Sequence, residues 1–289
     1  MVKKKKQAAP VLLTAPVVLL IVVILLIPMG YAVYCSLWRC DYMIFSKFLG
    51  LQNYIDLLSK PEILKDIGRS FYTSILSALL ALGFGVLLAV WVNKCNRRTA
   101  LILELIILVP WVTSMVIAAM LWRWMLNDNV GILKYLCQKL FGITQTGFLT
   151  NSSTAIYTLI LVMTWRVVGY VMVQALAGLK AIPEDLIEAA RIDGANKWDI
   201  FWRVRLPLIK TPLTISFVIV FLSNINNLTV PWTLTGGGPG SSTTTIAVEL
   251  YKYGFTHYYF GDAAALSMLL ILINTILTVV YLKAVKYEI

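Results

Sequence analysis

Long apolar runs separated by shorter polar segments make up most of this chain. A helix rises about 1.5 Å per residue, so a run of about 20 apolar residues crosses the roughly 30 Å hydrocarbon core of a membrane. The pattern therefore predicts an all-α membrane protein with six transmembrane helices. The predicted spans are about 11–34, 70–92, 101–122, 155–178, 208–228 and 264–282.

Composition supports this fold class. Hydrophobic residues make up 59% of the 289 positions and charged residues 13%, against about 25% in an ordinary soluble domain. Mean hydropathy is +0.80. These values exclude a disordered chain, a collagen-like chain and a small disulfide scaffold, and they argue against a soluble globular protein. We expect residues 1–68 to form a cytoplasmic tail, the first span and an outer loop, and residues 69–285 to form a five-helix core.

The first apolar run has two interpretations. Lys3 to Lys6 resemble the charged front of a signal peptide. However, the apolar stretch continues to Val33, which is long for a signal core, and no small-x-small cleavage site follows. We therefore interpret it as an uncleaved membrane helix.

The distribution of positive charge predicts the orientation. Fifteen of the 25 lysines and arginines fall in the N-terminal tail, the 93–100 loop, the 179–210 segment and the C-terminal tail. The positive-inside rule places these segments, and with them both termini, in the cytoplasm. The formal net charge of +11 is therefore mostly a topology signal. No basic patch is interleaved with aromatic residues, so we expect no nucleic-acid partner.

Residues for catalysis or metal binding are scarce. The chain has one histidine, His257, and its four cysteines form no CxxC pair. A disulfide between Cys35 and Cys40 is the alternative to unpaired thiols. The glycine-rich stretch 236–243 superficially resembles a phosphate loop but lacks the lysine that reaches the phosphates. We therefore expect no enzyme activity and no metal site, and any ATP-driven work would need a partner subunit.

The predicted cytoplasmic segment 182–207 carries clear helix punctuation. Pro183 suits a first helical turn, and Glu184 and Asp185 suit the positive end of the helix dipole. Arg191 lies toward the other end, and Gly194 suits the left-handed conformation that ends a helix. These signals predict a short surface helix.

A second short helix is predicted at about 197–204. Trp198, Phe201 and Trp202 recur at i, i+3 and i+4, so they share one aromatic face. Leu206-Pro207 then redirects the chain into the fifth span. The two interpretations are an interfacial linker resting among lipid headgroups and a docking element for a cytoplasmic protein.

The same segment resembles the EAA loop in inner-membrane permeases of binding-protein-dependent ABC importers. The spacing from the Glu-Ala-Ala triplet to the glycine and then to Leu-Pro agrees with that motif, although Val204 stands where the family commonly has isoleucine. The resemblance covers about residues 69–285 and implies that the first short helix couples the permease to an ATPase subunit. The implied coupling residues are Glu188, Ala189, Ala190, Asp193, Gly194, Ala195, Leu206 and Pro207.

A second resemblance lies in the predicted outer loop. Leu234-Thr235 followed by Gly236, Gly237, Gly238 and Pro239 is similar to a loop of sugar permeases of the maltose and glycerol-phosphate type. The resemblance implies contact with a solute-binding protein or gating of the outer mouth. Three glycines before a proline also indicate a mobile, turn-rich backbone, and a merely flexible loop is the alternative.

Polar residues inside predicted spans are candidates for a solute path. Arg166 lies near the middle of the fourth span, where a charge is costly and must face a cavity or a partner group. The alternative for Arg166 is a structural role, in which Glu104 is one candidate partner for its charge. Asn224 and Asn227 near the end of the fifth span, with Trp232 beyond, suit hydrogen bonding and stacking on a sugar. Their alternative is hydrogen bonding between helices.

Two local features bear on helix packing. Ser77, Ala81, Gly85 and Ala89 repeat every four residues, so this stripe predicts close approach of another helix. Pro110 interrupts the third span.

Together these features predict a permease subunit of a type I ABC importer that moves a sugar or oligosaccharide by alternating access. The resemblance implies a second permease, two ATP-binding subunits, an extracytoplasmic solute-binding protein and a lipid environment. It implies no cofactor in this chain, since ATP and Mg²⁺ would be bound by the ATPase subunits. The implied location is the cytoplasmic membrane of a prokaryote. Alternatives are a permease for another polar solute, such as a polyol or phosphate ester, and a non-transporting receptor or assembly factor.

Overall fold

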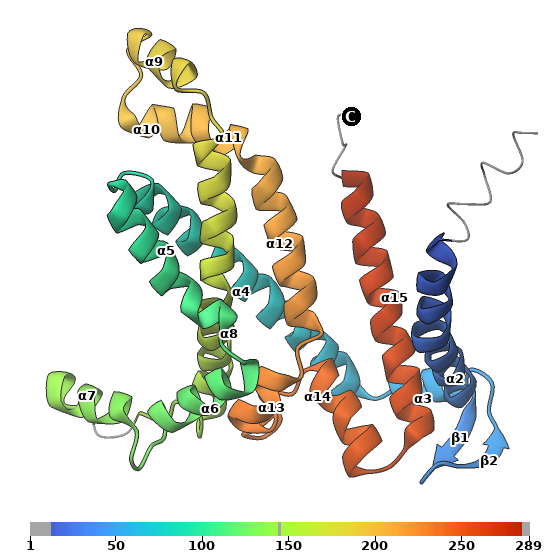
Figure 1. The fold of residues 1–289 in the computed structure, drawn as a ribbon. Helices are drawn as coiled ribbons and strands as arrows, with labels where there is room; N and C mark the ends of the chain where they lie inside the picture. Colours follow the sequence, from blue (N-terminus) through green and yellow to red (C-terminus); the bar gives the residue numbers. More distant parts are fainter. Residues whose placement is uncertain (1–12, 144–145, 285–289) are drawn as a thin grey trace, which may run out of the picture. The chain divides into compact units, whose positions relative to one another are not determined.

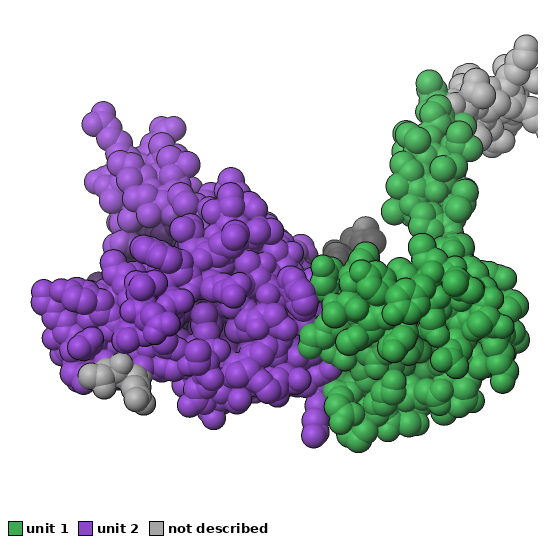
Figure 2. Space-filling model, turned by 90° about the horizontal axis from the view of Figure 1, so that it is seen from below, with its two compact units in different colours: residues 1–64, 249–289 green, residues 65–248 purple. Residues whose placement is uncertain are grey.

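The computed structural model describes residues 13–143 and 146–284, which form a mostly helical protein (Figure 1). The chain divides into two compact units, coloured separately in Figure 2. Unit 1 comprises residues 1–64 and 249–289, and unit 2 comprises residues 65–248. The cluster Lys3 to Lys6 and the end of the C-terminal tail lie outside the described residues.

Unit 1 is built on two long apolar helices. The first runs over Leu13–Ser36 and contains the π-helical segment η1 (Val22–Leu26) and helix α2 (Ile27–Ser36). The second, α15 (Phe260–Ala284), follows the π-helical turn η3 (Lys252–Thr256) and packs along α2. None of the most apolar window of Leu13–Ser36 is buried, as expected for a lipid-facing span.

A small β-hairpin follows the first helix, which the sequence analysis missed. Strand β1 (Trp38–Asp41) pairs antiparallel with β2 (Ile44–Phe48), and helix α3 (Gln52–Leu58) comes next. Tyr42 and Met43 form the turn with φ of 51° and 63°. Such turns usually use Asn-Gly or Asp-Gly, so this one lacks the residues that signal a hairpin.

The cysteine pair in unit 1 is unbridged. Cys35 and Cys40 are both buried and free. Burial, reinforced by the adjacent Cys35 thiol, raises the pKa of Cys40 to about 11. The protonated thiol is therefore the dominant form at neutral pH, and the disulfide considered from sequence is absent.

Unit 2 contains most of the remaining helices. Its long elements are α4 (Pro61–Val92), whose first turn belongs to unit 1, α8 (Ser152–Lys180) and α12 (Lys210–Ile225). The others are α5 (Arg97–Val112), α6 (Met115–Met125), α7 (Ile132–Phe141), α9 (Glu184–Ile192), α10 (Lys197–Asp199), η2 (Ile200–Arg205), α11 (Leu206–Leu208) and α13 (Thr229–Thr235). Helix α14 (Ile246–Tyr251) begins in unit 2 and ends in unit 1.

Helix α8 is the central element of unit 2 and is held by close backbone contacts. A Cβ atom on Gly85 of α4 would lie 2.7 Å from Val171 of α8. A Cβ on Gly169 of α8 would collide with the carbonyl oxygen of Ile107 in α5. The predicted small-residue stripe on α4 is confirmed as a packing surface, because Ser77, Ala81 and Ala89 are fully buried.

The membrane spans agree with the prediction in number but differ in form. Four helices are long and apolar enough to cross a membrane, and two bent helix pairs bring the total to six if each pair is one span. The third span is such a pair: α5 and α6 meet at 94°. The prediction that Pro110 interrupts the third span is wrong. Helix α5 passes through Pro110 and ends at Val112, where Thr113 and Ser114 turn to extended conformations. A proline removes only one backbone donor, and here the helix continues past it.

The fifth span is also bent. The segment Lys197–Leu208 meets α12 at 65°, and α12 ends at Ile225, three residues before the predicted end. Asn227 lies beyond it and caps α13 instead of extending the span.

Candidate functional site

The 182–207 segment folds as a helical hairpin at one end of unit 2, beyond α8 and α12 (Figure 1). Helix α9 begins after Pro183, with Glu184 and Asp185 in its first turn and Arg191 in its last. These charges oppose the partial charges of the helix ends, as the sequence predicted. Ile187 is the one buried residue of α9.

A left-handed glycine closes α9. Gly194 has φ of +83°. Its N–H donates to the Arg191 carbonyl at 3.1 Å, and the Ala195 N–H donates to the Ala190 carbonyl at 3.0 Å. This pair of bonds is a Schellman motif, which satisfies carbonyls left open at the helix end. The Asp193-Gly194-Ala195 sequence thus forms the turn that reverses the chain.

The second arm of the hairpin starts with a capping box. The Asn196 side chain accepts from the N–H groups of Trp198 and Asp199 at 2.8 and 3.0 Å, and Asp199 accepts from the Asn196 N–H at 3.4 Å. The arm continues through α10, η2 and α11 to Leu208. The end of α9 is therefore capped at Gly194 and the start of α10 at Asn196, so residues close together in the sequence determine the conformation of the turn.

An aromatic cluster joins this arm to the helical core. The rings of Trp198, Phe201 and Trp202 lie 5.2–6.4 Å apart, which confirms their predicted common face. Phe201 and Ile182 pack against a buried cluster that includes Leu179 of α8 and Ile209. The hairpin is therefore packed directly onto the ends of the helices α8 and α12.

The outer surface of the hairpin is apolar and accessible. Ile192 is 86% exposed and Trp198 69%, and Leu186 and Trp202 are also exposed. Glu188 and Ala189 are exposed, whereas Ala190 is half-buried. Leu206 is half-buried and Pro207 exposed. Exposed apolar side chains with interspersed charge are typical of a surface that binds another protein.

The polar residues at the end of the fifth span are tied into the protein. Asn224 is 5% exposed, and its amide donates to Ser77 Oγ of α4 at 2.8 Å. Asn227 accepts from the Val230 N–H at 3.0 Å and lies 3.8 Å from Met115 Sδ through its amide nitrogen. Trp232 is half-buried in α13. Asn224 thus links α4 to α12, and Asn227 fixes the start of α13.

Arg166 is buried in α8 and forms no ion pair with any residue that the structure describes. It is 8% exposed, and its Nε has no hydrogen-bond partner among the described residues. Its guanidinium lies over the Trp111 ring, 5.4 Å from the centroid, and Trp111 stacks on Tyr170 at 4.8 Å. The pairing with Glu104 is wrong, because Glu104 binds Lys180 at 3.1 Å.

The glycine-rich outer loop is held by threonine hydroxyls. Gly236 and Gly237 have φ of +65° and +90°, so this backbone requires glycine. Thr244 Oγ1 donates to the Gly237 carbonyl at 2.9 Å, and Thr243 Oγ1 donates to the Gly238 carbonyl at 2.8 Å. The loop, which leads to Pro239, has the turns that its glycines indicated, and the threonine hydroxyls hold its backbone through hydrogen bonds.

A polar face of α4 escaped the sequence analysis. Ser70 accepts from the Ile246 N–H at 2.8 Å, and the Ser77 carbonyl accepts from Thr164 at 3.4 Å. Ser74 Oγ is buried without a partner among the described residues. The signal was the recurrence of small hydroxyl residues every three to four positions; of these only Ser77 entered the sequence analysis, as the first residue of the packing stripe. The buried members of this face are Asp66, Ser70, Thr73, Ser74 and Ser77.

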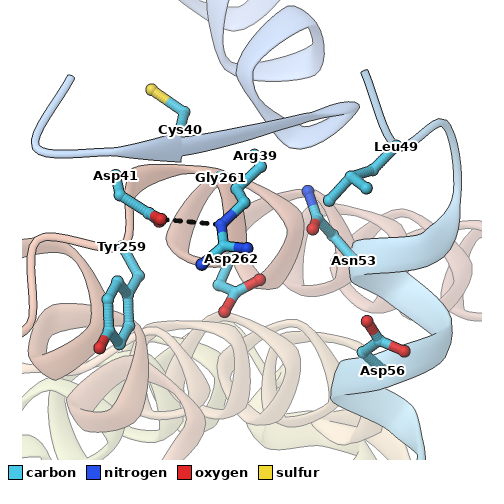
Figure 3. A pocket seen from close by; sticks show the side chains of 9 residues that line it. All are labelled: Arg39, Cys40, Asp41, Leu49, Asn53, Asp56, Tyr259, Gly261 and Asp262. Carbon is cyan, nitrogen blue, oxygen red and sulfur yellow. Dashed lines mark hydrogen bonds and ion pairs between the residues drawn. The ribbon is translucent and has the colours of Figure 1, made fainter. Parts of the chain in front are cut away.

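Unit 1 has a polar pocket of about 280 Å³ at the start of α15 (Figure 3). Arg39 and Asp41 form an ion pair at 3.0 Å, and the carboxylates of Asp56 and Asp262 also line the pocket. In the described residues no group of three or more His, Cys, Asp or Glu side chains is placed to hold a metal ion.

Comparisons with known proteins agree on one family. Residues 81–284 match the family described as binding-protein-dependent transport system inner membrane component. The trehalose/maltose transport system permease protein MalF of Thermococcus litoralis is 30% identical, with 91% of this chain and 88% of that protein covered. The sn-glycerol-3-phosphate transport system permease protein UgpA of Rhizobium meliloti is 31% identical, with 90% and 88% covered.

A solved structure shows the same fold. A chain of a bacterial alginate ABC transporter, crystallised in complex with an alginate pentasaccharide-bound periplasmic protein, superposes with a TM-score of 0.82 at 21% identity. The match covers 96% of this chain and 93% of that chain. The family match spans well over half of the sequence, and the fold and the membrane helices agree with it. This chain therefore belongs to the binding-protein-dependent transport system inner membrane components, the multi-pass permease subunits of ABC importers, which bind no cofactor and leave ATP hydrolysis to a separate subunit.

Proposed function

We propose that this permease imports a sugar or oligosaccharide across the cytoplasmic membrane of a prokaryote by alternating access. The relatives that transport trehalose/maltose and the alginate transporter support a carbohydrate cargo. The relatives that transport glycerol 3-phosphate make a phosphate ester the competing cargo. Competition between labelled trehalose or maltose and glycerol 3-phosphate in cells expressing the complete system separates the two. We expect the sugar to be taken up and the phosphate ester not to compete.

The observation that carries the proposal is the capped hairpin formed by α9 and α10–α11. It presents Glu188 and Ala189 on an exposed helix, and it is anchored to the core through Phe201. In the proposed complex this hairpin sits in a cleft of an ATPase subunit and transmits its movement. The other members are a second permease, a second ATPase subunit and an extracytoplasmic binding protein. This arrangement places both termini in the cytoplasm.

The proposed solute path uses the polar residues of α8, α12 and α13. Asn224, Asn227 and Trp232 offer hydrogen bonds and a stacking surface for hydroxyl-rich solutes, and Arg166 offers a positive charge. In the described conformation the two amides bond to neighbouring helices. They become available to solute when those helices separate. The Gly236–Pro239 loop contacts the loaded binding protein.

Charge reversal on the hairpin tests the coupling role. Glu188→Lys places a positive charge on the exposed face of α9, so the permease should dock poorly on its ATPase. We expect uptake to fall at least tenfold, with loss of ATPase stimulation by the loaded binding protein and normal amounts of chain in the membrane. The matched control is Glu62→Lys, an exposed reversal on α4 far along the sequence from the hairpin. Full uptake and stimulated ATPase activity in Glu188→Lys would contradict the proposal.

A further inference from the structure

Unit 2 has an apolar groove between α4 and the start of α12. Its volume is about 310 Å³. Leu79 and Leu82 of α4 form one wall, Leu213 and Phe217 of α12 form the other, and Leu206 also lines the groove. Both walls belong to segments that are long and apolar enough to span a membrane.

A cation marks one end of the groove. Lys210 lines it at the first residue of α12, is exposed, and forms no ion pair within the described part of the chain. Arg205, one turn earlier, is likewise unpaired among those residues. Thr214 is the one other polar lining residue, and its hydroxyl donates a hydrogen bond to the Lys210 carbonyl at 2.8 Å. The groove therefore offers apolar walls and one accessible positive charge.

The groove walls do not resemble a helix-docking surface. Helices associate in membranes through small residues and interhelical hydrogen bonds, because lipid tails are as apolar as leucine. On α4 the small residues Ala81, Gly85 and Ala89 are already buried in the interior of unit 2. The groove face carries leucine and phenylalanine and has no free hydrogen-bonding group apart from the lysine. These walls suit an acyl chain better than a helix.

We propose that an anionic phospholipid of the inner leaflet binds in this groove. One acyl chain lies between the leucines of α4 and Phe217, and the phosphate contacts Lys210 Nζ. Basic pockets between membrane helices on the cytoplasmic side are suited to such headgroups. The choice of the inner leaflet rests on the predicted cytoplasmic side of Lys210. Binding of the lipid does not depend on which solute the permease transports.

The position of the groove gives the lipid a mechanical consequence. Leu206 belongs to the second arm of the coupling hairpin, and the 65° bend between that arm and α12 lies directly at Lys210. A lipid wedged there supports the joint through which hairpin movement reaches α12. Anionic lipid should therefore promote transport, independently of cargo identity.

Native mass spectrometry of the assembled transporter tests the binding. The complex is exposed to equal amounts of phosphatidylglycerol and phosphatidylcholine, and retained lipid is counted. We expect the wild-type complex to retain phosphatidylglycerol preferentially. Lys210→Gln should lower that preference about fivefold, the contribution of one basic residue near an anionic surface. Lys94→Gln removes an exposed charge from another predicted cytoplasmic loop and should leave the preference unchanged.

A second readout identifies the occupant. Benzoylphenylalanine in place of Leu213, irradiated in the assembled complex, should yield a phospholipid adduct by mass. Cross-linking to another helix of this chain, to the second permease or to a second copy would overturn the proposal, because that segment would then fill the groove. Unchanged phosphatidylglycerol preference in Lys210→Gln would overturn the anionic headgroup contact. Both readouts are independent of uptake, so failure of the transport proposal is distinguishable.

Discussion

At the scale of single residues, backbone conformation explains why the turn of the 182–207 hairpin contains a glycine. Nothing lies within 4 Å of a Cβ built on Gly194, so space does not restrict this position. The backbone conformation restricts the position instead: Gly194 has φ of +83°, and this left-handed conformation costs other L-residues about 1–2 kcal/mol. Asparagine tolerates the conformation better than β-branched residues do.

This difference gives a graded prediction. Gly194→Asn should keep at least half of wild-type uptake, whereas Gly194→Val should lower uptake about tenfold because the hairpin turn is strained. Transport assays on membranes with matched amounts of permease would measure both. Equal uptake in the two variants would show that backbone strain at the turn does not limit coupling.

The buried polar residues show a second lesson at this scale. Asn224 and Arg166 both attracted attention as costly polar groups inside spans. The structure gives Asn224 a hydrogen bond to Ser77 and places Arg166 over Trp111. The free-energy cost of burying each polar group is offset differently: by an interhelical hydrogen bond for Asn224 and by a cation–π contact for Arg166. Composition alone does not show which of the two interactions a residue makes.

At the scale of elements, α8 depends on glycine for its approach to α5. Gly169 lies against the Ile107 carbonyl so closely that even a methyl group collides with backbone. A backbone obstacle cannot rotate away as a flexible side chain can. The α5–α8 contact is therefore intolerant of any side chain at this position.

Alanine substitution should reveal this intolerance. Gly169→Ala should destabilise the protein by about 1–3 kcal/mol through overpacking and lower the thermal transition of the purified complex by several degrees. The control is Gly83→Ala on α4, where nothing lies within 4 Å of the added carbon. It should be neutral or slightly stabilising, because alanine favours helix by about 1 kcal/mol. A thermal shift in Gly169→Ala no larger than in Gly83→Ala would contradict the packing argument.

At the scale of the whole molecule, transport by alternating access requires internal helix contacts to open. The hydrogen bond between Asn224 and Ser77 joins α12 to α4 across 147 residues of sequence. If α4 and α12 separate during the cycle, position 224 passes from a buried to a water-filled environment. A contact of this kind reports on the cycle better than an always exposed residue.

Thiol accessibility in the assembled transporter measures this change. Asn224→Cys, made in a chain whose four native cysteines are replaced, should react with a water-soluble thiol reagent at least tenfold faster in one nucleotide state than in another. Ile219→Cys is the control, since Ile219 is an exposed apolar residue of the same helix and should stay unreactive in lipid. Absence of labelling at position 224 in every state would remove Asn224 from the solute path.

The sequence by itself determined the features that depend on short-range patterns. Span number follows from the length of apolar runs, and the helix ends around Pro183 and Gly194 follow from residues that act within one turn. The aromatic face of Trp198, Phe201 and Trp202 follows from helical spacing alone. These effects involve neighbours a few positions apart, so no tertiary contact is needed to read them.

Only the tertiary structure decided the features that depend on distant partners. The exact place of the break in the third span, after Val112 and not at Pro110, was not readable from the sequence, and the hairpin at Tyr42-Met43 lacks the usual turn residues. The bonding of Asn224 and the apolar groove between α4 and α12 arise where segments more than 100 residues apart meet. A helix pattern states which face is apolar, but which neighbour covers that face, and what space remains between them, depends on how the whole chain packs.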